Sequence, residues 1–235
     1  MSKSNYRLVV GNKNYSSWSL RPWLLMRMFA IPFDEINVDI YSPGARARIL
    51  EHSPSGKVPA LKAGNLTLWD TLAIIEFLAE SHPGLAIWPK TREARAMARV
   101  VSAEMHSGFD ALRSEMPMDM TGSKPVETVS QGVARDVARI IDVWRKCRET
   151  YGSSNSEAIG QTKDDDGPFL FGDFCAADAM FAPVTSRFRT YGVDAAAHGD
   201  DGTAQAYCEA VLSLTEIEEW MRAGREEMAG RGKAY

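Results

Sequence analysis

The sequence of 235 residues has few of the residues that bind metals or form disulfides, with three cysteines (Cys147, Cys175 and Cys208) and four histidines. The cysteines are odd in number and widely spaced, and neither a CxxC pair nor an HExxH pattern occurs. These absences argue against a disulfide framework and against a dedicated metal site. Free thiols in a reducing compartment are the simpler interpretation, and they favour a cytoplasmic protein.

The sequence also lacks a long apolar run and an excess of basic residues. No uninterrupted apolar stretch approaches the length of a membrane span, and the polar start does not lead into a signal-peptide core. The formal net charge of -4 argues against a surface built for nucleic acid or anionic membrane. With 45% hydrophobic residues the chain can bury a substantial core, in two modest domains or one large one.

Short apolar segments separated by turn signals fill the first eighty residues. The alternation of apolar and polar residues and the turn residues predict strands, helices and a hairpin around Gly64-Asn65. In chain order these are strand 6–10, helix 20–30, strand 33–40, helix 45–51, strands 57–61 and 66–69, and helix 72–79. The order predicts a small α/β layer whose sheet lies between helices.

Two serines, Ser16 and Ser17, lie where the first strand meets the first helix. A proline costs no helix hydrogen bond within the first turn, so Pro22 predicts an N-cap near Ser19. The first turn has free backbone N–H groups and a positive dipole end, so a hydroxyl there can help hold a thiolate or a carboxylate. The alternative is that one of these serines is only an N-cap.

Three motifs in this half carry a family resemblance. They are Ser-Ser-Trp-Ser-Leu-Arg at 16–21, Val-Pro-Ala-Leu at 58–61 and Asp-Thr-Leu-Ala-Ile-Ile-Glu-Phe-Leu at 70–78. In this order and at this spacing they resemble the thioredoxin-like domain of the glutathione S-transferases, and most closely the serine-containing classes such as zeta. The resemblance implies a βαβαββα domain at residues 1–83, followed by an all-helical domain at 90–235 that forms the acceptor side of a cleft.

The resemblance also implies a glutathione site made of Lys57, Val58, Pro59, Asp70 and Thr71. Pro59 is expected to be cis, and the backbone of Val58 to pair with glutathione as an added strand. Asp70 can pair with the ammonium of the γ-glutamyl end, and the hydroxyl of Thr71 can donate to its carboxylate. Both residues are also ordinary caps for the start of a helix.

In the serine-containing classes a serine hydroxyl donates a hydrogen bond to the glutathione sulfur and favours the thiolate. Matching the motif arginine to Arg21 assigns this role to Ser16, with Ser17 as the neighbouring candidate. The serine is not itself the nucleophile. Because no cysteine lies at this junction, the sequence favours conjugation, isomerisation or thiolytic chemistry over redox chemistry.

Helical patterns dominate the second half. Apolar residues at helical spacing predict helices over 93–113, 131–150, 207–214 and 216–228, and a polar loop over 153–167. The segment from Phe169 to Asp178 resembles the capping box that begins a buried helix in this family. Here Cys175 takes the place of the usual serine or threonine, which bears on stability more than on activity.

The resemblance places the acceptor substrate against the first long helix of the second half. On that predicted helix, Met105, Phe109 and Leu112 share one face, and His106 and Arg113 lie beside them. These five residues are the predicted acceptor-binding residues, with Arg113 suited to a carboxylated acceptor. The alternative is that the apolar members are core residues and that His106 is an ordinary hydrogen-bonded helix residue.

The resemblance therefore implies a glutathione transferase, a detoxification enzyme that directs the glutathione thiolate at a small electrophile, with no metal. The first alternative is a zeta-like isomerase, in which glutathione adds reversibly to a maleyl-type diacid. The second alternative is a protein that binds glutathione or another ligand without catalysis. The family resemblance also implies a homodimer.

Overall fold

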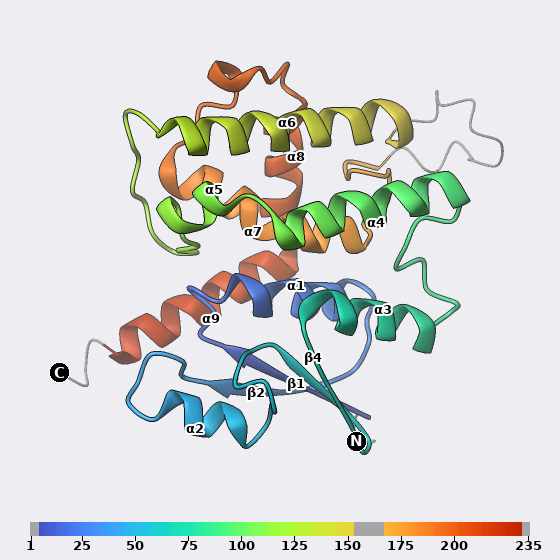
Figure 1. The fold of residues 1–235 in the computed structure, drawn as a ribbon, viewed down its shortest axis with the longest axis vertical. Helices are drawn as coiled ribbons and strands as arrows, with labels where there is room; N and C mark the ends of the chain where they lie inside the picture. Colours follow the sequence, from blue (N-terminus) through green and yellow to red (C-terminus); the bar gives the residue numbers. More distant parts are fainter. Residues whose placement is uncertain (1–4, 153–166, 232–235) are drawn as a thin grey trace.

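In a computed structural model of the chain, which describes residues 5–152 and 167–231, the first half has the predicted order of elements (Figure 1). Its elements are β1 (Tyr6–Gly11), α1 (Ser17–Met28), β2 (Asp34–Val38), α2 (Ala45–Leu50), β3 (Ala60–Ala63), β4 (Leu66–Trp69) and α3 (Thr71–Ser81). The predicted thioredoxin-like βαβαββα fold is confirmed.

The four strands form one mixed sheet in the order β2-β1-β3-β4. β1 pairs parallel with β2 and antiparallel with β3, and β3 pairs antiparallel with β4. Side chains alternate across this sheet: Leu8 and Val10 belong to the main core, whereas Val9 packs in a smaller cluster with Ile49 of α2. In Figure 1, α1 and α3 accordingly cover one face and α2 covers the other.

Helix α1 begins earlier than the sequence predicted. Its N-cap is Ser16, not a residue near Ser19, so Pro22 is an interior residue of the helix. A proline at this position has no N–H to donate to the carbonyl oxygen four residues before it, which belongs to Trp18. That oxygen accepts a hydrogen bond of 3.1 Å from the hydroxyl of Thr71 at the start of α3. A contact from another helix therefore compensates for the proline.

The second half is helical in the described residues, as predicted. Its elements are α4 (Arg92–Ser107), α5 (Asp110–Glu115), α6 (Gln131–Tyr151), α7 (Ala176–Tyr191), the short 3-10 helix η2 (Ala196–His198), α8 (Thr203–Leu212) and α9 (Thr215–Arg231). Of the predicted polar loop over 153–167, residues 153–166 lie outside the described residues. Among the described helices, none combines the length and the apolar character needed to cross a membrane.

The prediction of one continuous helix from Glu93 to Arg113 is wrong. α4 ends at Ser107, and Phe109 has a left-handed backbone, with a φ of 65°, before α5 begins. The guanidinium of Arg113 folds back and donates to the carbonyl oxygens of Gly108, at 2.8 Å, and of Met105. These hydrogen bonds satisfy carbonyl groups at the end of α4, which otherwise lack helical partners.

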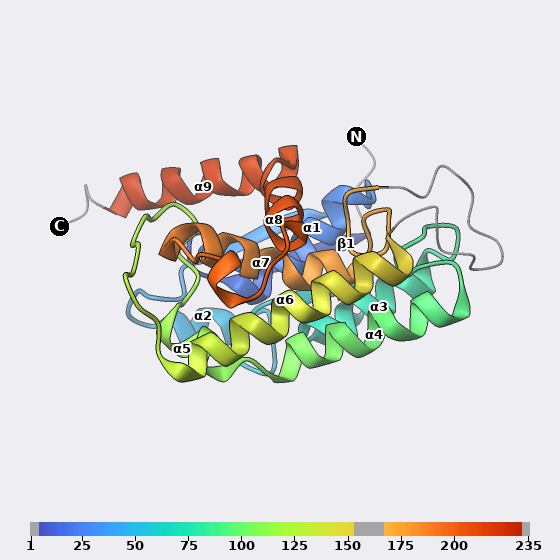
Figure 2. The same ribbon diagram turned by 90° about the horizontal axis from the view of Figure 1, so that it is seen from above.

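Helix α7 lies in the middle of the molecule, and most of its residues are buried. The carboxylate of Asp178 accepts from the backbone N–H of Cys175 at 2.8 Å and from that of Leu170 at 3.0 Å, so the predicted capping role of Asp178 is confirmed. α7 packs against α1 and α4 and joins the two halves of the chain. α9 returns to α1, as Figures 1 and 2 show, and the predicted domain limits at residues 83 and 90 stay predictions.

Candidate active site

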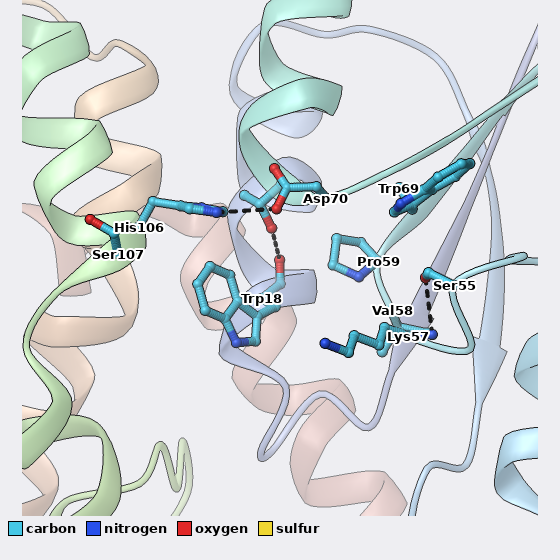
Figure 3. A pocket seen from close by; sticks show the side chains of 10 residues that line it. Trp18, Ser55, Lys57, Val58, Pro59, Trp69, Asp70, His106 and Ser107 are labelled. Carbon is cyan, nitrogen blue, oxygen red and sulfur yellow. Dashed lines mark hydrogen bonds and ion pairs between the residues drawn. The ribbon is translucent and has the colours of Figure 1, made fainter.

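A pocket of about 660 Å³ lies between the start of α1, the loop before β3, the start of α3 and the end of α4 (Figure 3). It contains all five residues predicted to bind glutathione and only one of the five predicted for the acceptor. The lining residues are Trp18, Ser55, Lys57, Val58, Pro59, Trp69, Asp70, Thr71, His106 and Ser107.

The peptide bond between Val58 and Pro59 is cis, as the resemblance predicted. Val58 precedes β3, and its backbone N–H and C=O have no hydrogen-bond partner among the described residues. The neighbouring backbone N–H of Lys57 donates to the hydroxyl of Ser55 at 3.2 Å. A peptide backbone entering the pocket could therefore pair with Val58 as an added strand.

The two carboxylate oxygens of Asp70 make different contacts. Its Oδ1 accepts from the backbone N–H groups of Leu72, at 2.9 Å, and Ala73, at 3.2 Å, and so caps α3. Its Oδ2 lies 3.1 Å from Nε2 of His106, which reaches across the pocket from the last turn of α4 (Figure 3). Capping and ligand binding are thus compatible, because each uses a different oxygen.

Thr71 is buried, and its hydroxyl donates to the carbonyl oxygen of Trp18. The proton that was predicted to reach a ligand carboxylate therefore already has a partner. The backbone N–H of Thr71 has no partner among the described residues and lies in the first turn of α3. Since free N–H groups of a first turn bind anions, this N–H is the better donor for a carboxylate.

The two candidate catalytic serines differ in their hydrogen bonds, and neither lines the pocket. The hydroxyl of Ser16 donates to that of Ser19 at 2.8 Å and accepts from the backbone N–H of Ser19 at 3.4 Å. Ser19 Oγ in turn accepts from the backbone N–H of Gly11 at 3.0 Å. The hydroxyl of Ser17 has no hydrogen-bond partner in the part of the chain that the structure describes. Ser16 is therefore the N-cap of α1, and the catalytic role predicted for Ser16 or Ser17 stays a prediction.

Most of the predicted acceptor-binding residues are not in the pocket. Met105, Phe109 and Leu112 are buried in the main core and do not line it. They do not share a helix face either, because the chain breaks its helix at Phe109. His106 lines the pocket, and Arg113 lies behind Trp18.

Four lining residues were not among the predicted site residues: Trp18, Ser55, Trp69 and Ser107. Trp18 makes the most contacts of interest. Its indole lies 5.1 Å from the imidazole of His106, and the guanidinium carbons of Arg21 and Arg113 lie 4.4 Å and 4.8 Å from an indole ring centroid. Contacts of this kind between guanidinium groups and tryptophan are attractive. The one available signal was position, because Trp18 stands between the serines of the motif.

Arginines on three different helices lie near one another: Arg21 of α1, Arg113 of α5 and Arg187 of α7. Arg21 and Arg113 both pack against Trp18. Burial lowers the pKa of Arg21 and Arg113, and it lowers that of Arg187 to about 10. The charge of Arg113 lowers the pKa of the other two further. Both Nη atoms of Arg21 and Nη1 of Arg187 are buried with no hydrogen-bond partner among the described residues. Orphaned buried donors of this kind favour an anion nearby.

The cysteines take no part in the pocket. Burial raises the pKa of the thiols of Cys147 and Cys208 to about 12 each, and that of Cys175 well above its ordinary range. Such thiols are poor nucleophiles near neutral pH because the thiolate is the reactive form. Across residues 5–152 and 167–231, no group of three or more His, Cys, Asp or Glu side chains is placed to hold a metal ion.

Comparison with known proteins points to one family. The family model "Glutathione S-transferase, N-terminal domain" matches residues 15–81. A probable maleylacetoacetate isomerase from Caenorhabditis elegans is 30% identical over 121 residues, which are 52% of this chain and 56% of that protein. A maleylacetoacetate isomerase from Rattus norvegicus is 27% identical over 183 residues, which are 76% of this chain and 77% of that protein.

The fold is also that of solved glutathione transferases. The crystal structure of a glutathione transferase homolog from Burkholderia, with bound glutathione, is similar with a TM-score of 0.66 and 22% identity, covering 94% of this chain and 98% of that one. At this identity the likeness concerns the fold. Residues 15–81 therefore match the N-terminal domain of the glutathione S-transferase family, and the described residues have the glutathione transferase fold.

Proposed function

We propose that the protein is a glutathione-dependent cis–trans isomerase of an unsaturated diacid of the maleyl type. The glutathione thiolate forms a C–S bond at one carbon of the double bond, and the electron pair moves onto the conjugated carbonyl group. Rotation about the resulting single bond follows, after which the C–S bond breaks and the double bond re-forms as trans. The thiolate is regenerated, and nothing is oxidised or reduced.

The glutathione half of the pocket supports this function. Val58 offers an unpaired backbone N–H and C=O for the peptide, and Thr71 offers a free N–H for the γ-glutamyl carboxylate. Asp70 Oδ2 is the acceptor for the ammonium, and Lys57 adds a cation that suits the other carboxylate of glutathione. The sulfur then lies toward the start of α1, where the hydroxyl of Ser16 or Ser17 and the helix dipole favour the thiolate.

The observation that carries the diacid substrate is the cluster of Arg21, Arg113 and Arg187 beside the pocket, of which Arg21 and Arg113 contact Trp18. Arg21 and Arg187 are buried, so Arg113, which is only half-buried, is the member that an acceptor carboxylate can reach. Its Nη1 has no hydrogen-bond partner among the described residues. The other two arginines add positive potential behind it, which is partly offset by Asp110 and Asp136.

The relatives support the isomerase over the conjugating transferase that the sequence analysis put first. The two relatives reported above, at 30% and 27% identity, are named maleylacetoacetate isomerases, the first of them as probable. A transferase acting on apolar electrophiles would have no use for a cluster of cations beside its acceptor. Conjugation remains the second candidate, because the same bound thiolate could attack an aryl halide.

The test is turnover of a maleyl-type diacid with glutathione, followed by NMR of the vinyl protons. We expect isomerisation by the wild type and a loss in kcat/KM of about tenfold or more in Arg113→Gln, since a charged hydrogen bond contributes about 1.5–3 kcal/mol. Arg95→Gln is a matched control, because Arg95 also donates to two backbone carbonyl oxygens but lies away from the pocket.

Three other results of these activity measurements would change the proposed function or the proposed site. Conjugation of an aryl halide without isomerisation of any diacid would make the protein a transferase. Glutathione binding without turnover of either substrate would make it a binding protein. Equal activity of Arg113→Gln and Arg95→Gln on the diacid would remove Arg113 from the site.

A further inference from the structure

His106 connects the two sides of the pocket. It projects from the last turn of α4 to Asp70 at the start of α3, with 3.1 Å between Nε2 and Oδ2 (Figure 3). Its ring packs edge-on against the indole of Trp18, with 5.1 Å between the ring centroids. The side chain of His106 is 27% exposed, so solvent protons and a ligand in the pocket can both reach it.

The oxygen that His106 contacts is the one a ligand needs. Asp70 Oδ1 already accepts two backbone N–H groups of α3, so Oδ2 is the acceptor left for an ammonium group. A neutral imidazole can donate from Nε2 to this oxygen and leave the negative charge of the carboxylate available. A protonated imidazole instead forms an ion pair with Asp70 and brings a second cation to the place where the ammonium binds.

The other charged groups around the pocket add to the difference between a neutral and a protonated His106. Lys57 faces the same pocket, while Arg21 and Arg113 approach from α1 and α5 on the ring of Trp18. Asp70 is the single carboxylate among the residues that line the pocket. Nδ1 of His106 is buried and has no partner among the described residues, so an added proton there gains no hydrogen bond.

We propose that His106 is a positioning residue that makes recognition of the glutathione amino group depend on pH: neutral His106 orients Asp70 for the ammonium, and protonated His106 competes with it. The proposal rests on the proposed function, because it takes glutathione as the ligand. Affinity for the ammonium group should therefore fall as the pH decreases and His106 gains a proton.

The probe is S-methylglutathione, because its sulfur cannot ionise and so adds no pH dependence of its own. Calorimetric titrations run from pH 5.5 to 7.5 on the wild type and on His106→Gln, which keeps a donor for Asp70 but does not titrate in this range. We expect affinity of the wild type to fall about tenfold toward pH 5.5, within the usual range of coupling between two sites. We expect His106→Gln to change less than twofold.

A second ligand tests the proposal without any variant. The analogue of S-methylglutathione that lacks the γ-glutamyl amino group should bind the wild type with an affinity that is independent of pH in the same range. Parallel pH curves for the wild type and His106→Gln, or a persisting pH dependence with the deaminated analogue, would overturn the proposal.

A different result would refute the glutathione site itself. If S-methylglutathione does not bind the wild type at any pH, the proposed function fails and this inference fails with it. If it binds with no pH dependence, only the role of His106 is overturned.

Discussion

The hydroxyl of Thr71 donates to the carbonyl oxygen of Trp18 at 3.1 Å, and this bond joins the start of α3 to the first turn of α1. It exists because Pro22 leaves that carbonyl without its helical donor. The same contact fixes the backbone of Trp18, whose indole lines the pocket and packs against the guanidinium groups of Arg21 and Arg113. One hydroxyl thus supports both the fold of α1 and the shape of the site.

Thr71→Val should destabilise the protein by about 1 kcal/mol, because a buried carbonyl oxygen loses its donor. Thr71→Ser should stay close to the wild type. In a Pro22→Ala background the cost of Thr71→Val should shrink, since the helix then supplies the missing N–H. Urea unfolding of the four proteins measures this cycle.

The control for that cycle is Thr67→Val on β4. The hydroxyl of Thr67 has no hydrogen bond to any described residue, so its loss should change stability by no more than about 0.5 kcal/mol. Equal costs of Thr71→Val with and without Pro22 would show that the threonine acts through packing alone.

Local patterns were sufficient to predict the order of elements in the first half, because turn residues and apolar periodicity are local signals. They could not place the start of α1, since an interior Pro22 depends on Thr71 from a distant helix. They also missed the break at Phe109, because the apolar spacing of Met105, Phe109 and Leu112 continues through it. The break depends on Arg113, which folds back onto carbonyl groups at the end of α4.

The residues predicted to bind glutathione line one pocket, whereas most of those predicted for the acceptor do not. The cis peptide between Val58 and Pro59 is present, but it was implied by the family resemblance, because most X–Pro bonds are trans. The acceptor side depends on which side chains meet across three helices. No sequence spacing indicates that Arg21 and Arg187 lie near Arg113.

The alanine variants of Ser16 and Ser17 should differ from each other in stability and in catalysis. Ser16→Ala removes an N-cap and should cost about 1 kcal/mol of stability, whereas Ser17→Ala should cost little. Whichever serine donates to the sulfur, its alanine variant should lower turnover and raise the pKa of the bound glutathione thiol. Ultraviolet absorbance of the bound thiolate against pH measures that pKa, and unchanged activity in both variants would refute the assignment.

Asp70→Asn should weaken glutathione binding by about tenfold or more and leave the protein folded. Asparagine keeps the oxygen that caps α3 but loses the charge that pairs with the ammonium. Asp194→Asn is the matched control, since Asp194 also accepts two backbone N–H groups but lies away from this pocket. Calorimetry with glutathione should distinguish the two, and equal affinities would exclude Asp70 as the ammonium partner.

The buried Asp178 should make stability fall as pH rises from about 4 to 6. Burial raises the pKa of its carboxyl group to about 6, although the N–H groups of Leu170 and Cys175 act to lower it. A folded-state pKa above the unfolded value of 3.8 means that the folded protein holds the extra proton. The resulting stabilisation is complete below the unfolded pKa and is lost as pH rises through 6.

Comparison with Asp178→Asn isolates this effect. The variant loses one hydrogen bond at every pH but carries no titrating group at this position. Asp142, whose pKa is lowered by its hydrogen bond with Lys146, has the opposite effect on stability, but it is present in both proteins and cancels. The free energy of unfolding of the wild type, relative to the variant, should therefore fall by about 2 kcal/mol between pH 4 and pH 7. A constant difference across that range would mean that Asp178 is already ionised in the folded protein at pH 4.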